Sequence, residues 1–78
     1  MTAWERACWH YASEHAGRHV RMLIGDRRTF EATSGRSEDH VFLIVSYLRE
    51  GELVDEHFEW DLAGNLQFHA EPIDREQL

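Results

Sequence analysis

The stretch HVFLIVSYL, residues 40 to 48, constrains the fold more than any other segment, because both of its alternate faces are apolar. A β-strand of this kind normally lies in the middle of a sheet and is covered on both sides. The segment therefore predicts a central strand over about 40–49. The residues on its two faces are Val41, Leu43, Val45 and Tyr47 on one side and Phe42, Ile44 and Leu48 on the other.

Turn residues after this strand predict two hairpins with definite registers. Glu50-Gly51 can form a two-residue turn into a strand over about 53–61, and Leu62-Ala63-Gly64 can form a three-residue loop, with Gly64 left-handed, into a strand over about 65–71. Directly opposed residues share a face, and these registers pair apolar with apolar side chains. Glu56, opposite Val45, is the exception and is expected at the sheet's rim. The predicted pairs are Tyr47 with Val54, Leu43 with Phe58, Val41 with Trp60, Trp60 with Leu66 and Phe58 with Phe68.

The N-terminal part of the chain predicts a helix followed by a first hairpin. TAWE at residues 2–5 has the spacing of a capping box, so a helix is expected over about 2–16, with Gly17 as its stop. After Gly17 the apolar residues recur at every second position, which predicts strands over about 18–24 and 28–33 with Phe30 and Ala32 on the core face. TSGRSED, residues 33–39, predicts a loop, and residues 74–78 a mobile tail.

Together these elements predict a single α+β domain over residues 1–78, with one N-terminal helix packed on a five-stranded antiparallel meander sheet. At 78 residues a chain buries only roughly 60% of its unfolded surface, so the core is expected to be small. One helix can cover one face of the sheet. A partner subunit is therefore a natural source of cover for the other face.

Composition limits the classes of partner. The net charge of −7 disfavours binding to phosphate backbones, and the charge is concentrated in residues 37–78, where eleven acids and two Arg give −9. Neither a membrane span nor a signal peptide is recognisable. The single cysteine, Cys8, cannot form an internal disulfide, which favours the cytoplasm. Nucleic acid and membrane are accordingly not the expected partners.

DEHFEWDLAGNLQFH, residues 55–69, alternates titratable with aromatic side chains and is the strongest candidate for chemistry. The predicted registers place His57 and His69 in one row of the outer face, with Glu59 in the next row. These three residues could ligate zinc, although the sequence has no Cys pair and no His-Glu-x-x-His pattern. Glu59 or Asp55 could act as a general base beside His57, but no nucleophile elbow or phosphate loop accompanies them. An enzyme is therefore the less favoured hypothesis, and no cofactor is expected.

The favoured hypothesis is a small acidic protein–protein interaction or regulatory module that self-associates through its second sheet face. An apolar centre with a polar, titratable rim is the composition of an interface. Trp9 lies about 140° from Trp4 on the helix and could anchor a partner, or it could cover a sheet edge or a residue such as Ile73. The expected partners are a second copy and an unidentified protein. The predicted contact residues are Trp9, Phe42, Ile44, Leu48, Leu53, His57 and His69.

Three resemblances supply further expectations. GRHVRMLIGDRRTFEA, residues 17–32, with the helix before it, resembles the Sm-like RNA-binding proteins, which have five bent strands; their uridine-binding motif of Asp, aromatic residue and Asn is missing near residues 36–40. VSYLREGELVDEHFEWDLAGNLQFH, residues 45–69, is similar to the final hairpins of nuclear-transport-factor-like domains, which implies a dimer and a ligand pocket. In charge and size the chain also resembles phage-type inhibitors that imitate DNA. These resemblances leave a DNA-mimicking inhibitor and a small ligand- or metal-binding domain as alternatives.

Overall fold

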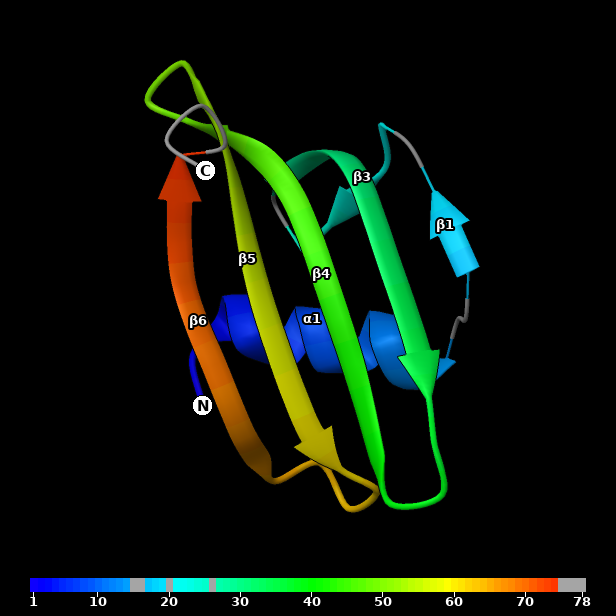
Figure 1. Cartoon of the computed structure of the whole chain (residues 1–78). Helices are drawn as coiled ribbons and strands as arrows, with labels where there is room; N and C mark the ends of the chain where they lie inside the picture. Colours follow the sequence, from blue (N-terminus) through cyan, green and yellow to red (C-terminus); the bar gives the residue numbers. More distant parts are fainter. Residues whose placement is uncertain (15–16, 20, 26, 75–78) are drawn as a thin grey trace.

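The computed structural model of the chain describes residues 1–14, 17–19, 21–25 and 27–74. Within these ranges it has one helix, α1 (Ala3–Glu14), and one antiparallel sheet of six strands. Across the sheet the order is β1-β3-β4-β5-β6, and β2 pairs with the first part of β3 (Figure 1). The predicted α+β fold, a helix on a five-stranded meander, is confirmed, with β1 and β2 sharing one edge position. The strands are β1 (Gly17–His19), β2 (Leu23–Ile24), β3 (Arg27–Arg36), β4 (His40–Arg49), β5 (Glu52–Asp61) and β6 (Leu66–Asp74).

Helix α1 lies across one face of the sheet, behind the strands in Figure 1. It starts as its capping residues predict, because the Thr2 hydroxyl oxygen accepts a hydrogen bond from the backbone nitrogen of Glu5 at 3.0 Å. Cys8, Tyr11 and Ala12 are buried and pack against the sheet. The predicted end of the helix at residues 15–16 lies outside the described residues. The sheet face under α1 is called the inner face below, and the opposite face the outer face.

The core lies between α1 and the inner face. Aromatic rings fill its centre, with Phe58 and Trp60 stacked at 5.3 Å between centroids and Trp9 meeting Trp60 edge-on at 5.4 Å. The β5–β6 turn approaches this group so closely that a Cβ added to Gly64 would lie 3.0 Å from the ring of Trp9. Trp9 is thus half-buried and packed inside the molecule. The largest fully buried side chains are Trp60, Tyr47, Phe58, Leu43, Val45 and Val54.

The predicted register between the central strand and β5 is confirmed in all three pairs. Tyr47 lies opposite Val54, Leu43 opposite Phe58 and Val41 opposite Trp60. The Glu50-Gly51 turn sets this register, and both of its residues have positive φ, 53° and 83°. That backbone twist matches the right-handed twist of the flanking strands, which is why a two-residue turn of this kind closes the hairpin.

The first hairpin differs from the prediction of two plain strands. Arg21 adopts a left-handed φ of 59° and divides the predicted strand 18–24 into β1 and β2, while residue 20 lies outside the described residues. A β-bulge between Thr29 and Glu31 then takes Phe30 out of the core alternation, so that Thr29 is buried in its place, while Ala32 is buried as predicted. The predicted core position of Phe30 is therefore wrong.

The predicted loop over residues 33–39 is mostly strand. Strand β3 continues to Arg36 because its backbone pairs with β4 throughout this stretch and with β1 over part of it, and these pairs satisfy the peptide groups whatever the side chains are. Only residues 37–39 form the connection to β4. At the other end of the chain, β6 runs to Asp74, and the rest of the predicted tail, residues 75–78, lies outside the described residues.

The register of the last hairpin is correct at the turn and wrong beyond it. Gly64 is left-handed, with a φ of 90°, and Leu66 lies opposite Trp60 as predicted. A bulge at Gln67 then adds one residue to β6, so that Phe58 faces His69 and Glu59 faces Phe68. One residue of slip moves the side chains that follow to the other face, until a second shift opposite Asp55–His57 returns Ile73 to the outer face. His69 consequently lies on the inner face and Phe68 on the outer face, the reverse of the prediction.

Burial of Cys8 predicts that stability falls in alkaline solution. Burial raises the pKa of the Cys8 thiol, and burial together with the hydrogen bond to Glu56 raises the pKa of Tyr47. A group whose pKa is raised by folding adds its full contribution to the free energy of unfolding while the pH is below its ordinary pKa. That pKa is near 9 for the thiol and near 10 for the phenol. The contribution is lost as the pH rises through the pKa of the folded state.

Urea unfolding should therefore give a lower free energy of unfolding at pH 10.5 than at pH 7. Cys8→Ala should make the decline smaller, because the variant has no thiol to ionise when it unfolds. Equal stability of the native chain at both pH values would contradict the burial of these two groups.

Candidate protein interface

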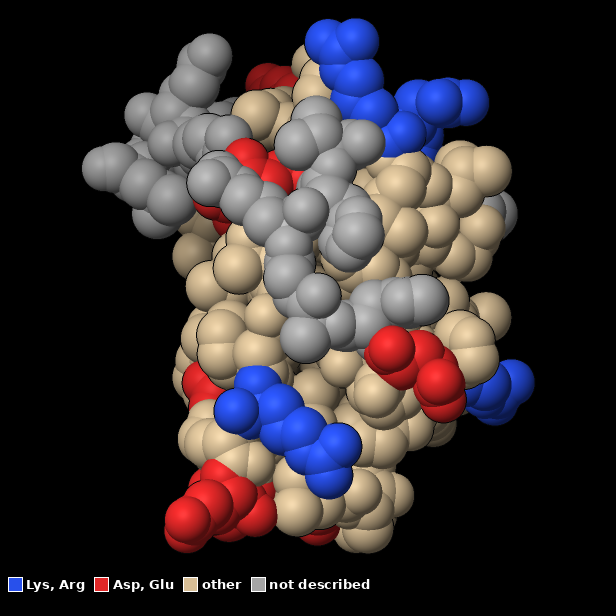
Figure 2. All heavy atoms as spheres, turned by 90° about the vertical axis from the view of Figure 1, so that its right-hand side faces the viewer, with Lys and Arg blue, Asp and Glu red and all other residues tan. Residues whose placement is uncertain are grey.

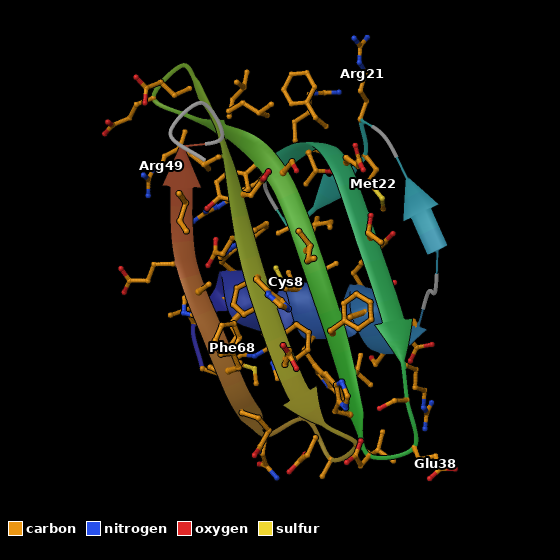
Figure 3. The ribbon with its side chains drawn as sticks, viewed as in Figure 1. Cys8, Arg21, Met22, Glu38, Arg49 and Phe68 are labelled. Atoms are coloured by element: carbon orange, nitrogen blue, oxygen red, sulfur yellow. The ribbon has the colours of Figure 1, made fainter. Side chains whose placement is uncertain are left out.

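The outer face is uncovered and carries the largest group of exposed apolar side chains on the sheet. No described element lies over it, as Figure 3 shows for the side toward the viewer. Strand β4 is the middle strand and contributes Ile44, which is 40% exposed at the centre of the face. Phe68 on β6 is 47% exposed, because the bulge at Gln67 turned it outward. The patch, called the outer apolar patch below, consists of Phe42, Ile44, Leu48, Leu53, Phe68 and Ile73.

The Phe42 ring lies over a glycine of the neighbouring strand. Gly35 lies opposite Phe42 in the β3–β4 register, and a Cβ added to Gly35 would clash with the Phe42 ring. The ring therefore occupies the space that a side chain at position 35 would take. An aromatic ring in this position covers the backbone that the glycine leaves exposed.

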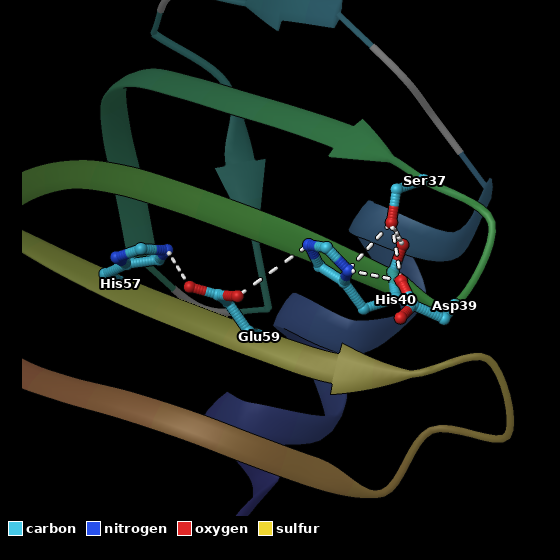
Figure 4. Close-up of polar contacts among 5 residues, drawn as sticks. All are labelled: Ser37, Asp39, His40, His57 and Glu59. Atoms are coloured by element: carbon cyan, nitrogen blue, oxygen red, sulfur yellow. Dashed lines mark hydrogen bonds and ion pairs between the residues drawn. The ribbon is translucent and has the colours of Figure 1, made fainter.

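A row of titratable side chains on β4, β5 and the β3–β4 connection runs across the outer face, among the apolar residues of the patch (Figure 4). Glu59 lies between two imidazoles, with one carboxylate oxygen 3.2 Å from His57 Nε2 and the other 3.8 Å from His40 Nε2. His40 Nδ1 lies 2.9 Å from an oxygen of Asp39 and 2.7 Å from the Ser37 hydroxyl. Hydrogen bonds from His40 and then Ser37 lower the pKa of Asp39.

This row does not have the geometry of a catalytic triad. In a triad the serine hydroxyl and the carboxylate contact opposite nitrogens of the histidine ring. Ser37 and Asp39 both contact Nδ1 of His40, and the carboxylate oxygen of Glu59 lies 3.8 Å from the other nitrogen, which is too far for a hydrogen bond. The row is instead a chain of alternating acidic and imidazole groups, of which His57 and Glu59 lie between the β4 and β6 residues of the outer apolar patch.

The predicted zinc ligands are not brought together. His57 and Glu59 lie on the outer face, whereas His69 lies on the inner face because of the bulge in β6. Among the described residues there is no group of three or more His, Cys, Asp or Glu side chains that could hold a metal ion. The shared row of His57 and His69 was the premise of the metal hypothesis, and it is wrong.

The predicted interface residues separate into two groups. Phe42, Ile44, Leu48, Leu53 and His57 lie on the outer face, since the β4–β5 register pairs them there. Trp9 belongs to the opposite layer and contacts Trp60 and Gly64 inside the molecule. His69 stacks on Phe58 at 4.5 Å on the inner face. Phe68 and Ile73, which were not predicted as contact residues, lie on the outer face.

The structure also contains a buried polar cluster that the sequence did not predict. Glu56 is only 4% exposed, and one of its carboxylate oxygens accepts hydrogen bonds from Trp4 Nε1 at 2.9 Å and from the Tyr47 hydroxyl at 2.7 Å. Its other oxygen lies 2.6 Å from His69 Nε2. The guanidinium carbon of Arg27 lies 4.3 Å above the Trp4 ring and 5.0 Å above the Tyr47 ring. The carboxylate thereby joins α1, β4 and β6 to β5.

The placement of Glu56 corrects the expectation that it lies at the rim. A buried carboxylate needs hydrogen-bond donors to replace water, and three side chains from different elements supply them. The signal for this cluster was the presence of Glu56 on the core side of the alternation, opposite Val45. Its donors are distant in sequence, and the correct register of β6 was required to find His69.

Comparisons with protein-family models, with curated proteins and with solved structures found no match for this chain. Among the described residues, no helix is long and apolar enough to cross a membrane.

Proposed function

We propose that the protein is a small, acidic, non-enzymatic interaction module that forms a homodimer through its outer sheet face. The observation that carries the proposal is the uncovered outer apolar patch, with Ile44 at its centre and the paired side chains of His57 and Glu59 among its apolar members. Contiguous apolar surface with a polar rim is typical of protein interfaces. The lone, buried thiol of Cys8 fits a reducing compartment such as the cytoplasm.

A second copy is the occupant that the face fits best. A chain of 78 residues buries a small core. An isologous dimer adds a second apolar layer that is built from a copy of the same chain. His57 and Glu59 lie on β5, between Phe42 and Ile44 on β4 and Phe68 on β6, and so would enter the contact when two patches meet. The Glu59 carboxylate lies 3.2 Å from His57 Nε2, so it has a partner there. The carboxylates concentrated in residues 37–78 would remain available to a further, basic protein partner.

Contact through the face is favoured over contact through a sheet edge. The edge strand β6 contains register shifts opposite Glu59–Trp60 and Asp55–His57, and Pro72 has no backbone N–H to donate. The opposite edge includes β1, which is only three residues long. Bulges, proline and short strands are the features that prevent edge-to-edge pairing. The outer face has no comparable obstacle.

Disulfide trapping tests the placement of the interface. Because Cys8 is buried, an introduced Ile44→Cys is the only accessible thiol, and its location on the middle strand places it near the centre of the proposed contact. We expect mild oxidation with oxidised glutathione to give a covalent dimer in high yield. Leu62→Cys, in the β5–β6 turn and 44% exposed, is the matched control and should give little. Equal cross-linking of both variants would count against the outer face.

A further inference from the structure

A cavity of about 330 Å³ lies beside the bulge in β3 and is lined by Arg21, Arg28, Thr29 and Phe30. It is distinct in charge from the rest of an acidic molecule, because two guanidinium groups and an aromatic ring meet there. Figure 3 shows Arg21 at the upper end of the molecule, and Figure 2 shows basic side chains gathered at the same end beside an uncharged surface. No ion pair joins either arginine to an acid among the described residues.

The walls of this cavity are fixed by backbone hydrogen bonds. The backbone nitrogen of Arg21 donates to the carbonyl oxygen of Phe30 at 3.0 Å. The carbonyl oxygen of Met22 accepts two hydrogen bonds from Thr29, one from the backbone nitrogen at 2.7 Å and one from the hydroxyl at 2.9 Å. Thr29 is fully buried, and its hydroxyl hydrogen is used inside the protein. The arginines and the phenyl ring are therefore the groups that a ligand would meet.

Arg21 has an unusual backbone conformation for its residue type. Its φ of 59° lies in the left-handed region, which asparagine and glycine adopt at lower cost. Strain of this kind is found where a side chain is needed at one particular place. Arg21 lines the cavity together with Arg28, and its side chain extends outward from the upper end of the molecule (Figure 3).

We propose that this cavity binds a mononucleotide-sized ligand that joins a phosphate group to a planar ring. Guanidinium groups pair with phosphate oxygens through charge-assisted hydrogen bonds, and an aromatic ring offers a surface on which a base can stack. The volume is at the lower end of the range of ligand sites and suits one phosphate and one ring rather than a dinucleotide. The inference does not depend on dimerisation.

The test is a titration of the native chain with adenosine monophosphate, followed by the amide resonances of the ¹⁵N-labelled protein. We expect shifts concentrated at residues 21–23 and 28–31. Ribose 5-phosphate, which has no planar base, and adenosine, which has no phosphate, should each bind about tenfold more weakly. Equal affinity for all three, or shifts spread over the whole surface, would overturn the proposal.

Variants of the cavity residues separate a site from general charge attraction. Arg28→Gln should weaken binding of adenosine monophosphate about tenfold. Arg21→Asn should do the same while keeping the fold, because asparagine accepts the left-handed backbone. Arg49→Gln, which removes an exposed arginine outside the cavity, is the control and should leave the affinity unchanged. If Arg49→Gln weakens binding as much as Arg28→Gln, the attraction is non-specific and the cavity is not a site.

Discussion

Glu56→Ala should destabilise the fold by about 3–4 kcal/mol, because the buried carboxylate is the common acceptor for donors from three elements. Its removal leaves Trp4 Nε1 and the Tyr47 hydroxyl without their acceptor and His69 without its anionic partner. An unsatisfied buried donor costs about 1–3 kcal/mol, and the truncation leaves a cavity as well. Urea unfolding followed by circular dichroism, at one protein concentration for all variants, measures the loss.

Two variants define the controls for that result. Glu59→Ala removes an equally charged residue from the partly exposed outer face and should cost less than about 1 kcal/mol, as exposed pairs do. Glu56→Gln keeps an oxygen that can accept from Trp4 and Tyr47 and should recover part of the loss. A Glu56→Ala variant as stable as Glu59→Ala would show that the cluster does not hold the elements together.

Ile44→Glu should weaken the proposed dimer at least about 100-fold while leaving the monomer folded. Ile44 lies at the centre of the outer apolar patch, so a carboxylate there would be taken out of water in the dimer and would add a like charge to each of the two facing patches. The side chain is 40% exposed in the monomer, and the substitution need not disturb the inner core. Sedimentation velocity over a dilution series measures the dissociation constant, and circular dichroism checks the fold.

Leu62→Glu separates the position of the charge from the charge itself. It adds the same negative charge to a leucine that is 44% exposed in the β5–β6 turn, away from the patch. Because each chain already carries a net charge of −7, this variant should weaken the dimer only slightly, and added salt should reverse that effect by screening. Similar losses for Ile44→Glu and Leu62→Glu would mean that general repulsion, not the patch, controls association.

The hairpin between β4 and β5 could be predicted from the sequence because two independent signals agree there. The Glu50-Gly51 turn fixes the register, and the alternation of apolar residues requires the same pairs. The β3–β4 and β5–β6 strand pairs contain bulges, at Phe30 and Gln67, that the local composition does not indicate. Each bulge inverts the faces beyond it, which is why Phe30 and His69 were assigned to the wrong sides.

The outer apolar patch could be predicted in part, and the buried cluster could not. Phe42, Ile44 and Leu48 follow from the alternation of one strand, whereas Phe68 reaches the face only through the bulge at Gln67. Glu56 depends on donors 52, 9 and 13 residues away in the chain, which only the folded arrangement of α1, β4 and β6 brings together. Long-range polar contacts of this kind leave no periodic signal in the sequence.

The molar mass of the native chain in solution tests self-association most directly. Light scattering at micromolar concentration, with a chelator present to exclude metal-bridged assembly, should give twice the chain mass of 9.2 kDa. The Ile44→Glu variant in the same buffer should give the mass of one chain. A native chain that remains at 9.2 kDa at every concentration tested would contradict the account and leave the outer face without its proposed partner.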